Sequence, residues 1–307
     1  MKIVISEFLN EAALSGFPDT WSVHYDPLLV DDRSAFLELL SGADALIVRN
    51  RTQVNEELLA AAPALKAVGR LGVGLDNIDM AACAAKDVAV HPATGANTLS
   101  VAEYVISSAL SLTRGSYDAK GAMLSGDWPR GALMGGEVSG RTMGLWGYGA
   151  IARAVAERTS ALGMNTIAHD PFLPADDTSW KGAERVSADA LLERSDVLSL
   201  HVPLTDETRG MIGAEAIASM KSTAILINTA RGGVVDETVL ADALKAGSLG
   251  GAALDVFVEE PLTAEAAAKF EGCPNLILTP HIAGVTIEGN VRVSELTVAS
   301  VRRTLES

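Results

Sequence analysis

A tight glycine turn, Gly147-x-Gly149-x-x-Ala152, follows a run typical of a buried strand (residues 142–146) and opens a run typical of a helix. This pattern constrains the fold more than any other in the sequence. The first two glycines let the backbone turn sharply and approach a pyrophosphate, and the alanine permits close packing. The helix N-terminus then supplies free N–H donors and a favourable dipole. The sequence therefore predicts a Rossmann unit that binds a dinucleotide.

An acidic residue, Asp170, supports this interpretation from the end of the next predicted strand. The glycine pattern alone is weak, because 28 glycines produce chance matches. Asp170 lies about twenty residues beyond the turn, where the dinucleotide fingerprint expects an acid. A carboxylate there accepts hydrogen bonds from both ribose hydroxyls and repels a 2′-phosphate. We therefore expect NAD and not NADP, with a surface aspartate before a proline as the alternative.

Strands and helices alternate along most of the chain. In the first 95 residues, apolar runs typical of buried strands lie at 2–5, 45–48, 67–68 and 88–90, with helices such as 56–62 between them. A long helix at 97–114 is apolar on most faces and must be buried on more than one side. Alternation resumes from residue 142 to about 284, and a last helix is expected at 288–305. The pattern predicts two α/β units.

Composition excludes several classes of protein. The net charge is −15, which argues against a nucleic-acid or anionic-membrane surface, so an anionic substrate requires a local basic cluster. Two cysteines, Cys83 and Cys273, are too few for a disulfide framework and suit a reducing cytoplasm. The first six residues form a strand pattern and not a signal peptide. No apolar run approaches the roughly 20 residues that span a bilayer.

Three charged residues, Arg231, Glu260 and His281, follow short apolar runs in the C-terminal half. These runs read as buried strands at 224–227, 251–254 and 276–278. Because the ends of parallel strands converge on one crevice, the three side chains are expected to meet there. The guanidinium suits a carboxylate and polarises the neighbouring carbonyl. The imidazole exchanges a proton with the oxygen, and the acid orients it. The set predicts chemistry on a 2-keto or 2-hydroxy acid.

Each of these residues has a simpler alternative when taken singly. Arg231 suits a strand-end cap, Glu260 a surface acid before a proline, and His281 a satisfied loop histidine; their joint occurrence favours an active site. Here the chain resembles the D-isomer-specific 2-hydroxyacid dehydrogenases over nearly its whole length. The resemblance implies a larger Rossmann NAD-binding domain (96–285) inserted in a smaller, flavodoxin-like substrate domain (1–95 and 286–307). Both are expected to be doubly wound parallel sheets. It also implies a glycine-rich arm at about 115–140 that packs against a second subunit in a homodimer, with a loop folded on its own domain as the alternative.

Further cofactor residues follow from the resemblance. Thr229, Ala230 and Asp255 are expected to face the nicotinamide, Asp255 through the carboxamide, unless Asp255 is only a helix cap. The segment 199–205 resembles the adenine-side wall of the family. The remaining positions expected to bind NAD are Ala150, Ile151, His201, Pro203, Thr205 and Gly284. We expect no metal.

Substrate residues are expected in the first unit. The N–H groups of Val73 and Gly74 lie in a glycine-rich loop that can cradle a carboxylate as a nest, or form a plain strand–helix turn. Arg49-Asn50-Arg51 follows a strand and is predicted to face the same cleft, with solvated arginines as the alternative. Two guanidiniums there indicate a second anionic group on the substrate. Asn97 is a further expected contact.

Within the family, three phrases resemble the sulfolactate dehydrogenases: residues 3–8, 92–97 and 280–286. The implied substrate is (S)-sulfolactate, with phosphoglycerate and other D-2-hydroxy acids as alternatives. Many phosphoglycerate dehydrogenases carry an appended regulatory domain, so an end at residue 307 favours a catabolic enzyme. The rival from another class is a non-catalytic NAD sensor resembling the dehydrogenase-like corepressors, which keep a similar Arg–Glu–His set.

Overall fold

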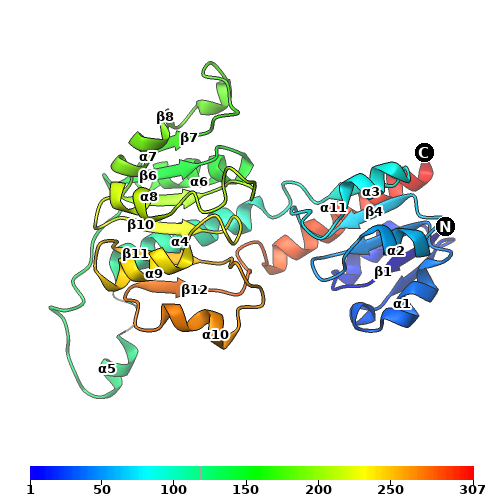
Figure 1. Ribbon diagram of the computed structural model, residues 1–307, viewed down its shortest axis with the longest axis horizontal. Helices are drawn as coiled ribbons and strands as arrows, with labels where there is room; N and C mark the ends of the chain where they lie inside the picture. Colours follow the sequence, from blue (N-terminus) through cyan, green and yellow to red (C-terminus); the bar gives the residue numbers. More distant parts are fainter. Residues whose placement is uncertain (116, 118) are drawn as a thin grey trace. The chain divides into compact units, whose positions relative to one another are not determined.

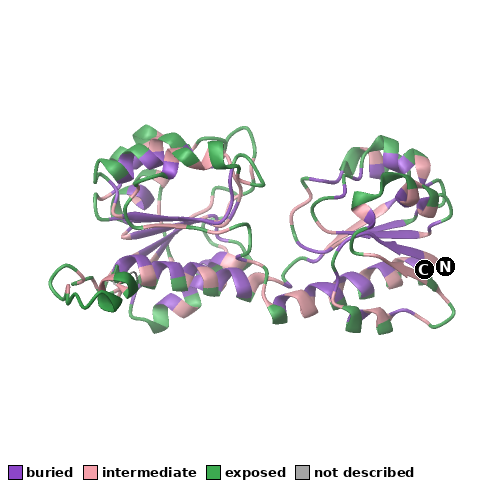
Figure 2. Cartoon of the chain, turned by 90° about the horizontal axis from the view of Figure 1, so that it is seen from below, coloured by how far each residue is buried: buried purple, intermediate pink, exposed green. Residues whose placement is uncertain are grey.

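The computed structural model describes residues 1–115, 117 and 119–307. The chain forms two compact units. Unit 1 comprises Met1–Asn97 and Val285–Ser307, and unit 2 comprises Thr98–Gly284. These bounds lie within two residues of those expected from the sequence. Each unit is a parallel sheet with helices on both faces (Figure 2).

Unit 1 contains a five-stranded sheet in the order β2-β1-β3-β4-β5. This is the 2-1-3-4-5 order of flavodoxin-like folds. The strands are β1 (Lys2–Ile5), β2 (Ser22–Tyr25), β3 (Ala45–Val48), β4 (Ala67–Arg70) and β5 (Ala89–Pro92). The helices are η1 (Glu11–Gly16), η2 (Leu29–Asp31), α1 (Arg33–Leu40), α2 (Glu56–Ala61), α3 (Met80–Ala85) and α11 (Ile287–Glu306).

Alternation along the strands of unit 1 sends side chains to two separate cores. Ile3 and Ile5 of β1 pack with Val298 and Val301 of α11, whereas Val4 packs on the opposite face with the α1–α3 layer. A period of two residues produces this division, because successive strand side chains point to opposite faces. The last helix is thus part of unit 1, although it follows unit 2 in the sequence (Figure 1).

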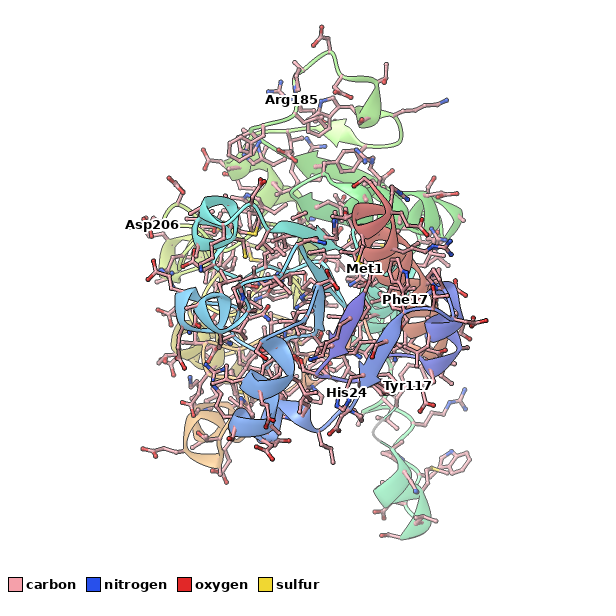
Figure 3. The ribbon with its side chains drawn as sticks, turned by 90° about the vertical axis from the view of Figure 1, so that its right-hand side faces the viewer. Met1, Phe17, His24, Tyr117, Arg185 and Asp206 are labelled. Carbon is pink, nitrogen blue, oxygen red and sulfur yellow. The ribbon has the colours of Figure 1, made fainter. Side chains whose placement is uncertain are left out.

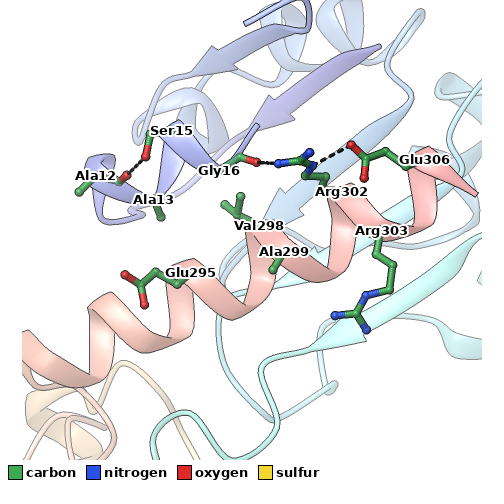
Figure 4. A pocket seen from close by; sticks show the side chains of 10 residues that line it. All are labelled: Ala12, Ala13, Ser15, Gly16, Glu295, Val298, Ala299, Arg302, Arg303 and Glu306. Carbon is green, nitrogen blue, oxygen red and sulfur yellow. Dashed lines mark hydrogen bonds and ion pairs between the residues drawn. The ribbon is translucent and has the colours of Figure 1, made fainter. Parts of the chain in front are cut away.

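Helix α11 also holds the short helix η1. Arg302 donates from Nη1 to the carbonyl of Gly16 (3.0 Å) and from Nε to Glu306 (2.8 Å). Ser15 donates to the carbonyl of Ala12 (2.8 Å). These residues line an open pocket between η1 and α11 (Figure 4). None of the residues expected to bind substrate or cofactor lines this pocket.

Unit 2 contains a seven-stranded parallel sheet in the order β12-β11-β10-β9-β6-β7-β8. Counted from β6, this includes the 3-2-1-4-5-6 order of the Rossmann fold, with β12 added at the edge. The strands are β6 (Thr142–Trp146), β7 (Asn165–His169), β8 (Glu184–Arg185), β9 (Val197–Leu200), β10 (Ile225–Asn228), β11 (Gly251–Leu254) and β12 (Leu276–Leu278). The strand order reverses between β6 and β9, where such folds bind their ligands.

Helices cover both faces of this sheet (Figures 1 and 2). One face packs against α4 (Thr98–Arg114) and α6 (Ala150–Ala161). The other face packs against α7 (Ala188–Arg194), α8 (Ala214–Ser219) and α9 (Glu237–Lys245). The smaller helices of unit 2 are α5 (Lys120–Leu124), η3 (Thr178–Trp180), α10 (Ala264–Ala267) and η4 (Ala268–Phe270).

The predicted elements agree with the structure except at some ends and edges. Strand β5 begins at Ala89 and ends at Pro92, whereas residues 88–90 were expected, because its partly exposed side chains give a weak apolar signal. Strand β2 was not expected; it is an edge strand with no buried residue. Among the described residues, no helix is long and apolar enough to cross a membrane.

The predicted arm, 115–140, contains the short helix α5, which extends away from the rest of unit 2 (Figures 1 and 3). Residues 116 and 118 of this arm lie outside the described residues. Several large apolar side chains of the arm face solvent: Trp128 is 77%, Leu124 79% and Met134 85% exposed.

Candidate active site

Arg231, Glu260 and His281 all follow strands that are hydrogen-bonded neighbours. Strand β10 pairs with β11, and β11 pairs with β12, all in parallel register. The three side chains therefore leave the sheet at its carboxyl edge. Gly232 allows the first two loops to approach, since a Cβ on Gly232 would lie 1.8 Å from the carbonyl oxygen of Phe257.

His281 and Glu260 form a hydrogen-bonded pair, with 2.8 Å between Nδ1 and Oε2. Glu260 is held in turn by the N–H of Phe257, which donates to Oε1 (2.9 Å). Burial acts to raise the pKa of Glu260, but the bonds from His281 and Phe257 and the charge of Arg231 outweigh it and lower this pKa. The carboxylate can then only accept, so Nδ1 carries the proton. In the neutral ring this leaves Nε2 as the basic nitrogen.

The backbone around Arg231 is fixed by Asn228. Its Nδ2 donates to the carbonyl of Arg231 (2.9 Å), and its Oδ1 accepts from the N–H of Ala230 (3.0 Å). The guanidinium of Arg231 donates to the carbonyl of Ala230 (2.6 Å). Because this charge also lowers the pKa of Glu260, the structure brings all three predicted residues into one electrostatic set.

Asp255 is 1% exposed and holds the loop that carries His281. Its Oδ1 accepts from the hydroxyl of Thr279 (2.6 Å) and the N–H of Ile282 (2.8 Å). Its Oδ2 accepts from the N–H of Ala283 (2.8 Å). The alternative of a helix cap is wrong, since no helix begins at Asp255. Oδ2 accepts a single bond and retains an acceptor position, as the expected carboxamide contact requires.

The glycine turn lies at the switch point of the unit 2 sheet. Gly147 has φ +86°, and a Cβ there would lie 2.5 Å from the carbonyl of His201, at the end of the neighbouring strand. Gly149 is the N-cap of α6, and a Cβ there would meet nothing within 4 Å. Ala150 and Ile151 form the first turn of this helix. Open space at a helix N-terminus fits a pyrophosphate.

Asp170 braces the glycine turn from the end of β7. Its Oδ2 accepts from the N–H of Tyr148 (2.9 Å), and its Oδ1 accepts from the N–H of Phe172 (2.9 Å). Each oxygen retains acceptor capacity for a ribose hydroxyl. The carboxylate thus has a structural role that the sequence did not reveal, beside the cofactor role expected of it.

Buried polar atoms without a partner lie beyond the ends of β9 and β10. Among the described residues, neither Nε2 of His201 nor Oγ1 of Thr229 has a hydrogen-bond partner. Burial lowers the pKa of His201 to about 4, so the ring is neutral at neutral pH. Buried polar groups usually find partners, so these atoms fit a polar ligand such as the nicotinamide and adenosine parts of NAD. Pro203 and Thr205 lie in a turn closed by Thr208, whose Oγ1 donates to the carbonyl of Pro203 (2.7 Å).

The predicted loop of unit 1, Arg49 to Thr52, is built around a buried carboxylate. Glu7 is 3% exposed and accepts from the N–H groups of Arg49 (2.9 Å), Asn50 (3.2 Å), Arg51 (3.0 Å) and Thr52 (3.0 Å). Burial acts to raise the pKa of Glu7, but the backbone N–H bonds outweigh it and lower this pKa. The main chain of this loop is therefore held by one side chain.

The two arginines of this loop differ in their partners. Arg51 is exposed and forms a two-pronged ion pair with Asp31, through both terminal nitrogens. Arg49 is partly buried: one nitrogen donates to Oδ1 of Asn290 (3.1 Å), and its guanidinium lies 5.8 Å from the ring centroid of Phe8. Among the described residues, no acid forms a salt bridge with Arg49. The two guanidiniums thus have different partners, and the predicted contact of both with a second anionic group of the substrate stays a prediction.

Val73 and Gly74 follow Gly72, whose φ of +149° turns the chain after β4. Within the described part of the chain, the N–H groups of Val73 and Gly74 have no acceptor. Oδ1 of Asn97 is likewise buried without a partner there. The two free N–H groups suit an anionic ligand, whereas the oxygen of Asn97 can only accept and suits a donor such as a hydroxyl group. Gly284 ends unit 2, directly after the loop held by Asp255. The described residues contain no cluster of three or more potential metal ligands.

Sequence reasoning missed five residues that shape these sites. Glu7, Phe8 and Asn290 hold the loop of Arg49, and Tyr104 and Thr279 lie behind His281. Glu7 was detectable in principle, since it is an acid just after a buried strand. The others gave no signal, because their partners are distant in the sequence.

Comparison with known proteins is consistent with this geometry. Residues 106–283 match the family model of the D-isomer specific 2-hydroxyacid dehydrogenase, NAD binding domain. An (S)-sulfolactate dehydrogenase from Chromohalobacter salexigens is 56% identical over 99% of this chain and 98% of its own length. A D-3-phosphoglycerate dehydrogenase from Mycobacterium tuberculosis is 40% identical over 99% of this chain, which spans only 56% of that protein. The solved structure of a D-lactate dehydrogenase from Aquifex aeolicus, complexed with NAD and lactic acid, matches with a TM-score of 0.83. It is 29% identical and covers 99% of this chain and 95% of its own.

Proposed function

We propose that this chain, which belongs to the D-isomer-specific 2-hydroxyacid dehydrogenases, oxidises (S)-3-sulfolactate to 3-sulfopyruvate with NAD. The observation that carries the chemistry is the pair of His281 and Glu260 at 2.8 Å. It leaves Nε2 of the imidazole to exchange a proton with substrate. The substrate class rests on the 56% identity to a sulfolactate dehydrogenase over nearly the whole chain.

In this proposal each residue of the set has one role. Arg231 and the N–H groups of Val73 and Gly74 bind the substrate carboxylate. Nε2 of His281 accepts the hydroxyl proton as the C2–H bond breaks, and Glu260 stabilises the imidazolium that forms. NAD, when bound, supplies the acceptor for the hydride from C2. Gly147, Gly149 and Asp170 would hold that cofactor.

We assign the distal anion to Arg49 and not to the two arginines together. Arg51 is already neutralised by Asp31, whereas Arg49 spends one donor on Asn290. A guanidinium has five N–H donors in a planar fork, which suits a tetrahedral oxyanion. One guanidinium with no salt bridge among the described residues favours a sulfonate, with a single negative charge, over a phosphate monoester, which carries nearly two. Phosphoglycerate is therefore the second candidate.

A substrate screen tests the proposal directly. The purified protein is assayed for NADH formation with (S)-sulfolactate, D-3-phosphoglycerate, D-lactate and D-glycerate. The expected order of kcat/KM places sulfolactate first and the acids without a distal anion last. Phosphoglycerate in first place would contradict the proposed substrate. Absence of turnover with every 2-hydroxy acid would instead favour the NAD-sensing alternative.

We also propose a homodimer formed through the arm. The arm exposes Leu124, Trp128 and Met134, which are large apolar side chains. Exposed apolar patches on otherwise polar surfaces mark interaction sites. Trp128→Asp should lower the mass measured by light scattering from that of a dimer to that of a monomer. A monomeric wild type would contradict the assignment.

A cytoplasmic location is our remaining proposal about the setting of the enzyme. Cys83 and Cys273 are both free. Cys83 is buried, and burial raises the pKa of its thiol, which suits an inert structural residue in a reducing compartment. Cell fractionation tests this location.

A further inference from the structure

A chain of hydroxyl groups connects helix α4 to the loop of His281. The phenol of Tyr104 on α4 lies 2.6 Å from Oγ1 of Thr279, just after β12. Oγ1 of Thr279 in turn donates to Oδ1 of Asp255 (2.6 Å). A threonine hydroxyl has one proton, so the proton in the first bond must come from Tyr104. Burial raises the pKa of Tyr104, which keeps that proton in place.

The end of this chain fixes the backbone on both sides of His281. Asp255 accepts from the N–H of Ile282 and Ala283 through its side chain, and from the N–H of His281 through its carbonyl (2.8 Å). His281 has φ +55°, in the left-handed region that side-chain-bearing residues seldom adopt. Such a conformation persists only where its surroundings over-determine it.

The direction of the imidazole depends on this backbone. The His281–Glu260 bond of 2.8 Å requires Nδ1 to face Glu260, so Nε2, on the other side of the ring, is the nitrogen left for the proposed substrate. Glu260 alone fixes one nitrogen and leaves the ring free to rotate with its loop. A second anchor behind the loop is needed to set the position of Nε2, and Thr279 is the side chain that ties this loop to Asp255 from behind.

We propose that Thr279 and Tyr104 are positioning residues for proton transfer by His281. They act through Asp255 and touch neither substrate nor the reacting atoms. This inference rests on the proposed role of His281. Misplacement of a reacting group by about 1 Å can cost on the order of a hundredfold in rate, so the loss of this anchor should lower kcat.

The test compares Thr279→Val, Thr279→Ser and Tyr104→Phe in the full chain, with (S)-sulfolactate and NAD. Thr279→Val preserves shape and removes both bonds, so kcat should fall about ten- to a hundredfold with KM within about threefold. Thr279→Ser retains the hydroxyl and should restore kcat to within about threefold. Tyr104→Phe leaves the bond to Asp255 intact and should cost less than Thr279→Val.

A matched control separates positioning from general damage. Thr113 is a buried threonine on α4 whose hydroxyl has no partner among the described residues. Thr113→Val should leave kcat unchanged. The melting temperatures of all variants are measured beside the rates. The primary isotope effect with 2-deuterated substrate should rise in Thr279→Val, because the chemical step becomes slower than product release.

The decisive comparison is made in a His281→Ala background. If Thr279 acts through His281, Thr279→Val should lower the residual kcat of His281→Ala no further. An equal further loss would overturn the inference, as would near-normal kcat in Thr279→Val alone. Near-full turnover in His281→Ala would refute the proposed function itself. If Thr279→Val does not fold, Tyr104→Phe takes its place. A fall in kcat that disappears in the His281→Ala background supports the inference, and an equal fall in that background overturns it.

Discussion

Two buried carboxylates, Asp255 in unit 2 and Glu7 in unit 1, organise the two sets of candidate site residues in the same way. Each lies at or near the carboxyl end of a strand and accepts backbone N–H groups from a neighbouring loop. The loops differ in what they carry. Asp255 holds the loop of His281, the residue proposed to exchange a proton, whereas Glu7 holds the loop of Arg49, whose guanidinium is a charged hydrogen-bond donor. In the proposed function, one anchor would therefore serve proton transfer and the other substrate recognition.

Because the two loops carry different residues, we expect changes in the two units to affect different kinetic constants. A group that acts only in the transition state contributes to kcat, whereas uniform binding appears mainly in KM. Changes near Asp255 should thus lower kcat, and changes near Glu7 should raise KM. The predictions below test this division between kcat and KM.

The largest effect is expected for His281→Ala. Loss of a positioned acid–base group should lower kcat in both directions by roughly a hundredfold or more. Affinity for NADH, measured by fluorescence titration, should change little, because the imidazole is assigned to substrate. A variant with near-full turnover would show that the proton moves by another route.

Arg49 and Arg51 give the next largest effect and test the recognition side. Loss of a charged hydrogen bond of about 1.5–3 kcal/mol predicts a fall of about ten- to a hundredfold in kcat/KM for sulfolactate in Arg49→Gln. Arg51→Gln should change it by less than about threefold, because Arg51 is paired with Asp31 on the surface. Turnover of D-lactate, which has no distal anion, is the control. Equal losses in both variants would restore the prediction of two acting arginines.

The sequence predicted those parts of the molecule that repeat a local pattern. Strands β1, β3, β11 and β12 match the expected residues, because each is a short apolar run. The glycine turn was also predictable, since its residues are close in the sequence. The three charged residues could be grouped because parallel strands share a carboxyl edge.

The parts that could not be predicted depend on pairs distant in the sequence. No pattern shows that Arg51 pairs with Asp31 while Arg49 meets Asn290. The bond of the Tyr104 phenol could not be predicted either. A tyrosine on an apolar helix is typical of core packing, and its partner, Thr279, lies far away in the sequence. Such contacts decide which of two similar residues is available for a ligand.

Asp170 is expected to have a smaller effect, confined to the cofactor. Asp170→Asn should weaken NAD binding by about tenfold and let NADP compete, since the charge that repels a 2′-phosphate is lost. Asparagine can still accept one of the two bonds from Tyr148 and Phe172, whereas alanine can accept neither. Asp170→Ala should therefore bind NAD more weakly than Asp170→Asn. Isothermal titration with both cofactors measures this. An unchanged preference would leave Asp170 only its structural role.

The smallest effect is expected in the free energy of unfolding on mild acidification. Here the comparison is between His201 in unit 2 and His91 in unit 1. The folded pKa of His201 is lowered to about 4 by burial, from an ordinary 6.5. The unfolded chain therefore binds more protons in this window, and stability is lost as the pH falls from 6.5. Burial and Arg303 also lower the pKa of His91 in unit 1, but His91 is less buried and bonded to Thr304 (2.7 Å). The pKa of Glu7 is lowered from 4.5 in the folded state, so its contribution to stability is fully present above pH 4.5 and is lost only as the pH falls below that value.

Urea unfolding at about pH 7 and about pH 5.5 measures these contributions. The His201 shift predicts a loss of about 1 kcal/mol in unfolding free energy over this interval. His201→Gln should remove most of this dependence and His91→Gln less. Glu7→Gln should lower stability at both values and leave the difference between them unchanged, because its titration lies below the interval. A larger change in His91→Gln than in His201→Gln would show that acid sensitivity resides in unit 1, against the burial of His201 beside the predicted cofactor site.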